Sequence, residues 1–97
     1  MTIESDAHPA DDWYVYILRC ADGSLYTGIA KDPERRLDEH NGSDLGAKYT
    51  RARRPVALVY HEAVASRSEA ARRECAIKRL SRTAKERLVA GPAAPAG

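Results

Sequence analysis

Phenylalanine is absent from this 97-residue chain, which also has only two cysteines, one tryptophan and one methionine. Cys20 and Cys75 show neither CxxC spacing nor the histidine spacing of a zinc site, so neither zinc nor a disulfide framework is indicated. We expect both to be buried free thiols in a reducing compartment. Long apolar runs are also missing, and the N-terminus is acidic where a signal peptide would be basic. These absences predict a cytoplasmic protein without a membrane segment.

Lys and Arg are missing from the first 12 positions, which carry four acidic residues. The rest of the chain therefore holds all 16 Lys and Arg and ten of the 14 acidic residues, a net charge of +6. Much of this charge lies in the acid-free stretch KYTRARR, residues 48–54. Tyr49 and Thr50 within that stretch favour contact with a phosphate backbone. A solubilising charged surface is the alternative interpretation.

The length and an apolar content of 43% fit one small domain. Residues 1–12 and 91–97 lack hydrophobic periodicity and are rich in Pro, Ala, Gly or acidic residues. We therefore expect disordered tails on either side of a domain at residues 13–90.

Three strands and three helices are expected in the order ββαβαα, which predicts an α+β fold with a small three-stranded antiparallel sheet flanked by helices. The strands should lie at 13–20, 25–29 and 56–63, the helices at 33–40, 66–80 and 83–90, and a loop at 42–55. Asp32 is the expected N-cap of the first helix. Ser66 with Glu69, and Thr83 with Glu86, have capping-box spacing. One apolar stripe of the second helix should face the sheet: Ala70, Ile77 and Leu80.

The length of the first turn decides which tyrosines share a face of the sheet. A two-residue turn would place Tyr16 and Tyr26 on opposite faces. Gly23 instead favours a three-residue loop, in which Cys20 pairs with Ser24 and both tyrosines project from one face. Gly28 would then lie opposite Tyr16 and leave open space beside its ring. This arrangement indicates a site, although half-buried tyrosines are also common in strands for structural reasons.

Several short stretches resemble the GIY-YIG nuclease superfamily over nearly all of residues 13–90. YVY at 14–16 and YTG at 26–28 match the two halves of the family name, with Tyr14 in place of the first glycine. HNG at 40–42, GAKYTR at 46–51, RPVALVY at 54–60 and AARRECAIKRL at 70–80 are similar to its small stand-alone members. The chain is also similar to the nuclease module of the Slx structure-selective endonucleases. Tyr14 is expected to pack rather than react.

The resemblance implies roles for four residues in phosphodiester hydrolysis. Arg36 would clamp the scissile phosphate, since its charge is permanent and its fork is bidentate. Tyr16 would act as the general base, with His40 helping to accept the proton, and Tyr26 would orient water or phosphate. A phenol with a pKa near 10 needs a nearby cation or metal for this task. Either tyrosine remains open as the base.

The family pattern selects Glu74 as the metal ligand, and Glu69 is already used at the third position of a capping box. A single carboxylate with several waters suits Mg²⁺. The alternative for Glu74 is an exposed ion pair with Lys78 four residues later.

Nucleic-acid contacts are assigned to basic residues and one tyrosine: Lys31, Lys48, Tyr49, Arg51, Arg53 and Arg54. Solvated lysines are an equal alternative for Lys31 and Lys48. Arg35 should pair with Glu39 on the helix surface. Asn41 fits either a helix C-cap or a substrate contact. His8 and His61 receive no chemical role.

The sequence thus predicts a Mg²⁺-dependent endonuclease acting on DNA, with RNA possible, in DNA repair or structure-selective processing. The alternative is a nucleic-acid-binding module that does not cleave, within a repair or RNA-processing complex. A protein-interaction adaptor is a third reading. Specificity would come from the basic patches, the shape of the substrate or a protein partner.

Overall fold

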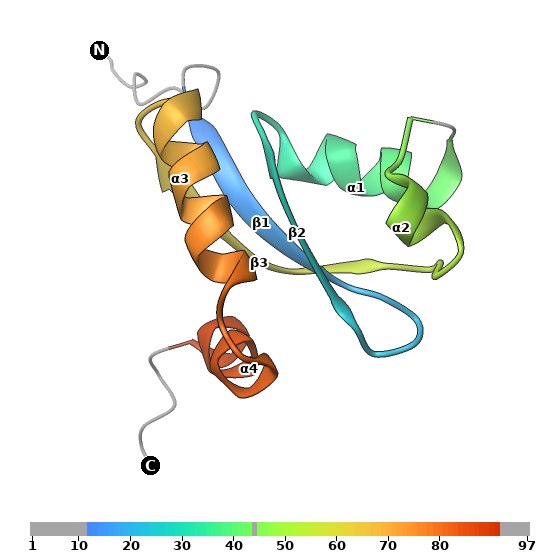
Figure 1. Ribbon diagram of the computed structural model, residues 1–97. Coiled ribbons are helices and arrows are strands. Elements are labelled where there is room, and N and C mark those ends of the chain that lie inside the picture. Colours follow the sequence, from blue (N-terminus) through green and yellow to red (C-terminus); the bar gives the residue numbers. More distant parts are fainter. Residues whose placement is uncertain (1–11, 44, 92–97) are drawn as a thin grey trace.

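The computed structural model describes residues 12–43 and 45–91, so most of the two expected tails lies outside the described residues. Its elements follow the predicted ββαβαα order with one addition, the short helix α2 (Figure 1). The strands are β1 (Trp13–Arg19), β2 (Leu25–Ala30) and β3 (Ala57–Val64). The helices are α1 (Pro33–Gly42), α2 (Lys48–Arg51), α3 (Arg67–Lys78) and α4 (Arg82–Ala90).

The three strands form one antiparallel sheet in the order β2-β1-β3, which confirms the predicted α+β fold. Helices α1 and α2 lie on one side of this sheet, and α3 lies on the other with α4 beyond its end (Figure 1). The prediction of a loop at 42–55 is wrong in one respect, because this region contains the single turn of α2. Its buried Thr50 helps to hold that turn against α1.

Alternation along the central strand β1 divides the interior into two layers. Val15 and Ile17 are fully buried toward α3, where they meet Ala70 and Ile77. The intervening residues of β1 point toward α1 and pack with Val56 and with apolar side chains of β2, α1 and β3. The sheet thus carries an apolar layer under α3 and a mixed aromatic layer under α1.

The β1–β2 turn is the predicted three-residue loop. The Cys20 N–H donates to Ser24 O at 2.8 Å, and Gly23 has a φ of 87°, which a residue with a side chain adopts with difficulty. The strand register places Tyr16 opposite Gly28 and Tyr26 opposite Leu18. Tyr16 and Tyr26 therefore share the face of the sheet that α1 covers.

Helix caps were predicted correctly at Asp32 and Ser66, whose side chains accept from the backbone N–H groups of Arg35 and Glu69. The cap of the last helix was placed wrongly. Ser81, not Thr83, accepts from the Ala84 N–H at 3.1 Å.

Glu86 does not cap the last helix as expected. It forms a bidentate ion pair with Arg19, at 2.9 and 2.6 Å.

Two predictions of buried residues in the C-terminal part of the chain are also wrong. Leu80 is 37% exposed because α3 ends at Lys78, before the stripe reaches it. Cys75 is exposed, whereas Cys20 is buried as predicted. No helix in the described part of the chain is both long and apolar enough to cross a membrane.

Asn41 joins α1 to the start of β3. Its amide nitrogen donates to Val56 O at 2.9 Å, and its amide oxygen accepts from the Val56 N–H at 2.7 Å. The C-cap of α1 is Ser43. Asn41 is therefore not the helix C-cap: it substitutes for a strand neighbour at the point where β3 begins.

Replacing Asn41 with Ala should lower the free energy of unfolding by about 1–3 kcal/mol, because both main-chain groups of the buried Val56 lose their partner. Urea denaturation measures this. Asp38→Ala, an exposed change on the same helix, is the matched control and should stay within about 0.5 kcal/mol of the parent. Equal loss in the two variants would contradict this role of Asn41.

Candidate active site

A buried hydrogen bond between the sheet and α1 lies at the centre of the candidate site. The Tyr16 hydroxyl, from β1, is 2.9 Å from Nε2 of His40, near the end of α1. Tyr16 is 1% exposed and His40 is completely buried. The two residues expected to share the proton chemistry are thus in direct contact.

The segment after α1 holds the His40 ring in place. The backbone N–H of Ala47 lies 3.2 Å from His40 Nδ1, and the hydroxyl of buried Thr50 lies 2.9 Å from the same nitrogen. The Thr50 hydroxyl also donates to Ala47 O at 2.9 Å. Both ring nitrogens of His40 are thus engaged, Nδ1 by this segment and Nε2 by the Tyr16 hydroxyl.

Burial controls the charge of this pair. Burial, followed by the positive charge of Arg36, lowers the pKa of His40 from 6.5 to about 4, so the imidazole is neutral at pH 7. Burial, followed by the nearby Tyr26, also raises the pKa of Tyr16, from 10.0 to about 12. Arg36 lowers the Tyr16 pKa and Glu74 raises it. Tyr16 thus experiences the charges of both residues named from sequence as phosphate clamp and metal ligand.

Gly28 allows the Tyr16 ring to lie flat over β2. A Cβ atom at Gly28 would come within 2.5 Å of the Tyr16 hydroxyl oxygen. The open space expected beside the ring is therefore wrong: the ring itself occupies it. A glycine is needed here for close approach and not to leave a void.

Aromatic rings continue from the buried pair toward the surface. The Tyr26 ring meets His40 edge-on, with centroids 5.3 Å apart, and stacks on Tyr49 of α2 at 5.9 Å. The Arg53 guanidinium covers the other end of this stack, 3.9 Å from the Tyr49 ring centroid. Tyr49 also donates to the Ser24 hydroxyl at 2.9 Å. Tyr26 and Tyr49 thereby link the first hairpin to α2.

Arg36 projects from α1 beside this cluster, and two hydrogen bonds hold its guanidinium group in place. One guanidinium nitrogen donates to Glu39 at 2.8 Å and to Leu45 O at 2.6 Å. Its side chain is 30% exposed. Arg35 forms the predicted pair with Glu39 at 3.6 Å but is far more exposed. Arg36 is thus positioned between the buried tyrosine and solvent, where an anion could reach it.

Glu74 lies on α3, which packs against β2 as well as β1. Its carboxylate is 3.2 Å from Lys78, so the alternative ion pair is formed. Among the described residues no three His, Cys, Asp or Glu side chains cluster as a metal site. A divalent cation would therefore depend on Glu74 and water. That donor set fits Mg²⁺, which keeps much of its hydration shell.

The basic residues fall into two groups. Lys31, Lys48 and Arg51 are exposed, the last two on α2. Arg53 is paired with Asp22 at 3.1 Å.

Arg54 is used inside the fold. It donates to the carbonyl oxygens of His40, at 2.5 Å, and Ser43, at 2.7 Å. The structure thus gives Arg54 a role in holding the end of α1 that the sequence did not suggest. Thr50 and the Ala47 backbone were also missed, because no spacing pattern marks contacts made by the single turn of α2 and its N-cap.

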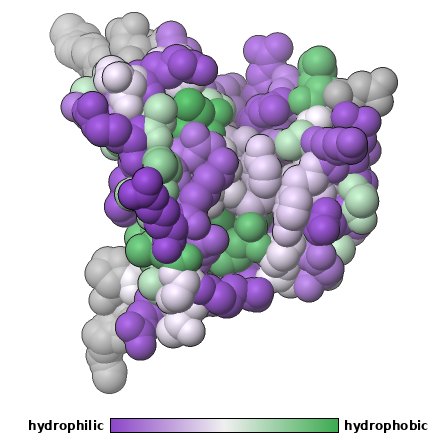
Figure 2. Space-filling model, viewed as in Figure 1, coloured by the Kyte–Doolittle hydropathy of each residue, from purple (hydrophilic) through white to green (hydrophobic). Residues whose placement is uncertain are grey.

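Figure 2 shows the molecule in the orientation of Figure 1. Hydrophilic side chains cover much of α3 on one side and much of the α1–α2 region on the other, with a paler strip between them. A bound strand crossing this strip would meet polar groups from both sides.

The chain matches the family model for the GIY-YIG catalytic domain over residues 12–87. It belongs to the GIY-YIG family.

Other members of this family are similar in sequence and structure. A UPF0213 protein of Desulfotalea psychrophila is 61% identical over 77 residues, covering 79% of this chain and 70% of that protein. A UPF0213 protein of Staphylococcus saprophyticus is 54% identical, covering 81% and 95%. The solution structure of the UPF0213 protein BH0048 of Bacillus halodurans is 50% identical, with a TM-score of 0.54 and coverage of 87% and 88%. The resemblance to small GIY-YIG members is thereby confirmed.

Acid should weaken this GIY-YIG domain through His40. Its pKa is about 4 in the folded chain and 6.5 when unfolded, so the unfolded state binds the proton first as pH falls. The free energy of unfolding should drop by about 3 kcal/mol between pH 6.5 and 4 from this group. Urea titrations across that range measure it. His40→Gln should flatten the slope, whereas His61→Gln, an exposed control, should keep it; equal slopes would refute the assignment.

Gly28→Ala should lower the free energy of unfolding by about 1–3 kcal/mol, because the added methyl displaces the Tyr16 ring and lengthens its bond to His40. Gly42→Ala is the control, since nothing lies within 4 Å of its added Cβ atom. That helical change should be neutral or stabilising by about 0.5–1 kcal/mol. Urea denaturation compares the two, and a neutral Gly28→Ala would show that the ring is free to move.

Proposed function

We propose that this GIY-YIG domain is a Mg²⁺-dependent endonuclease that hydrolyses phosphodiester bonds in DNA. The observation that carries the proposal is the convergence of opposite charges on one buried hydroxyl: Arg36 and Glu74 both shift the pKa of Tyr16, which is bonded to His40. A buried phenol whose pKa responds to a cation and a carboxylate is a candidate functional group. DNA repair or structure-selective processing in the cytoplasm is the setting we propose.

Arg36 binds the scissile phosphate in this scheme. Its guanidinium stays charged at any physiological pH and offers several N–H donors to phosphate oxygens. Glu39 and the Leu45 carbonyl fix one of its nitrogens, which limits the freedom of the side chain before the substrate arrives. Phosphate contact then requires little further ordering.

Tyr16 is the residue we propose as general base, with Tyr26 orienting the water or phosphate. A tyrosine with a pKa of about 12 cannot take a proton at pH 7 unless its phenolate is stabilised. His40 Nε2 lies 2.9 Å from the phenol oxygen, and the neutral imidazole can take the phenol proton, while the positive charge of Arg36 stabilises the phenolate. His40 thus helps to accept the proton as Tyr16 becomes the base.

Glu74 is the residue that would hold Mg²⁺, which would supply positive charge to the phosphate oxygens and the leaving group. The carboxylate now pairs with Lys78, so the lysine has to release it. Occupation of Glu74 by a cation would also offset the negative charge that raises the pKa of Tyr16. Base and metal ligand are therefore coupled through the field at one hydroxyl.

Exposed basic side chains on α2 and at the end of β2 are the proposed contacts for the nucleic-acid backbone: Lys31, Lys48 and Arg51. RNA is possible through the same charge. Selection among DNA structures would then depend on substrate shape or on a protein partner.

Arg36→Ala and Glu74→Gln should each reduce cleavage of DNA by at least about 100-fold, because each removes charge stabilisation from the transition state. The assay uses single-stranded, duplex and branched DNA with Mg²⁺ or with chelator. Neighbours on the same helices provide matched controls: Arg35→Ala and Glu69→Gln should retain parental activity.

Two results would contradict the proposal. Parent and variants that bind DNA equally without cutting any substrate would favour the non-cleaving module. Cleavage that survives both Arg36→Ala and Glu74→Gln would place the chemistry elsewhere.

A further inference from the structure

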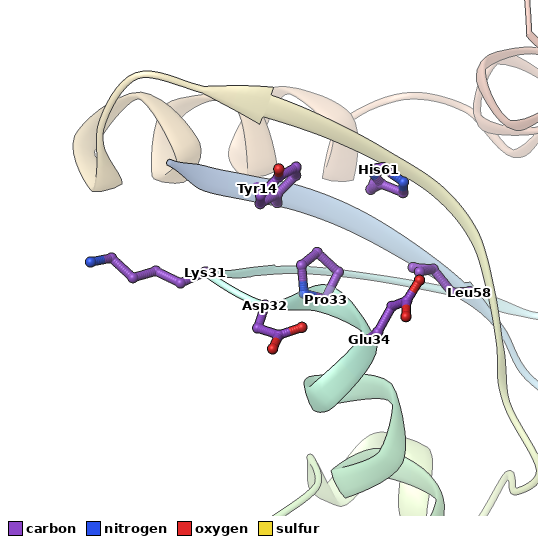
Figure 3. Close-up of a pocket in the computed structure, with 7 residues that line it drawn as sticks. All are labelled: Tyr14, Lys31, Asp32, Pro33, Glu34, Leu58 and His61. Carbon is purple, nitrogen blue, oxygen red and sulfur yellow. The ribbon is translucent and has the colours of Figure 1, made fainter. Parts of the chain in front are cut away.

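A pocket of about 510 Å³ opens beside the proposed active site, on the same side of the sheet. Tyr14 of β1 and His61 of β3 form one wall, and the first turn of α1 forms the other (Figure 3). Tyr14 and Tyr16 lie on one face of β1, two residues apart, which is about 7 Å along a strand. The pocket is therefore about one nucleotide away from the proposed catalytic hydroxyl.

The walls of the pocket suit a flat aromatic ligand. The Tyr14 and His61 rings meet edge to face, with centroids 5.6 Å apart and an interplanar angle of 70°. Leu58 and Pro33 supply apolar surface around them. Aromatic side chains of this kind stack on nucleobases whatever the base sequence.

The charges in the pocket disfavour a phosphate. Asp32 and Glu34 both line it. Asp32 already accepts from the Arg35 N–H as the cap of α1. Glu34, exposed in the first turn of α1, remains as the hydrogen-bond acceptor for an amino group. Lys31 is the one basic residue among those that line the pocket, and in Figure 3 it extends away from the aromatic pair.

We propose that this pocket binds an unstacked nucleobase that carries an exocyclic amino group. The base stacks on one ring of the Tyr14–His61 pair and meets the other edge-on, and its amino group donates to Glu34, as carboxylates accept from cytosine N4 in nucleic-acid readout. Within a strand this is the base next to the bond that is cut, so that part of the inference rests on the proposed nuclease function. The pocket thereby sets a preference for cytosine, adenine or guanine over thymine, which has no exocyclic amino group, beside the cleavage position.

NMR titration of the ¹⁵N-labelled chain with deoxycytidine and with thymidine tests the pocket by itself, without cleavage. Deoxycytidine should shift the backbone signals of Tyr14, Glu34 and His61, at least about fivefold more tightly than thymidine. Glu34→Ala should abolish this preference because it removes the acceptor, whereas Asp38→Ala, the same kind of change one turn further along α1, should keep it. Shifts confined to other residues, or equal affinity for the two nucleosides, would overturn the proposal.

A second arm asks whether the base comes from a strand. An abasic position scanned along a cytosine-containing oligonucleotide, in chelator, should weaken binding by about tenfold at one position only. His61→Ala should lose that position dependence while keeping its fold. Nucleoside binding without any DNA cleavage leaves the pocket standing and removes the nuclease proposal. Cleavage with no position-dependent loss overturns the pocket and leaves the nuclease proposal intact.

Discussion

The hydrogen bond between Tyr16 and His40 depends on most of the fold. It needs the three-residue turn that sets the β1–β2 register, and it needs Gly28 beneath the Tyr16 ring. It also needs the end of α1 to stay in place, which Arg54 secures through the His40 carbonyl. Because an unpaired hydroxyl at this depth would be costly, each of these elements is tied to the others through one contact.

This contact also sets the resting state of the site. Burial keeps Tyr16 protonated and His40 neutral at pH 7. Only added positive charge near the phenol oxygen changes that state, and in the proposed mechanism a cation at Glu74 would supply it beside the permanent charge of Arg36. A base that becomes competent only when the cation site is filled would not activate water beforehand.

The features that were predicted most accurately from the sequence are those set by neighbouring residues. Gly23 sets the turn, and Asp32 and Ser66 begin their helices through contacts three residues away, so each can be read from neighbouring letters. The family model and the sheet order bear out the fold that those signals predict. The grouping of Tyr16 with His40 followed from the motif resemblance.

Contacts made by irregular segments were not predictable in this way. Thr50 and the Ala47 backbone reach His40 from a stretch with no periodicity, and Arg19 meets Glu86 across 67 residues. Such contacts form only when the packing of the whole domain brings the two segments together, and their spacing in the sequence does not predict them. The same limit explains the error at Leu80, since the end of α3 decides whether the apolar stripe continues.

The use of arginines inside the fold limits how the chain could hold a nucleic acid. Arg53 is bound to Asp22 and Arg54 to main-chain carbonyls, so the basic stretch 48–54 offers less charge to a ligand than its sequence suggests. Affinity from phosphate contacts grows with the number of charges neutralised and falls with salt. Within this stretch the exposed cations are Lys48 and Arg51, so a ligand held there needs another source of binding energy. Stacking in the pocket at Tyr14 and His61, or a protein partner, would provide it where charge alone is too weak.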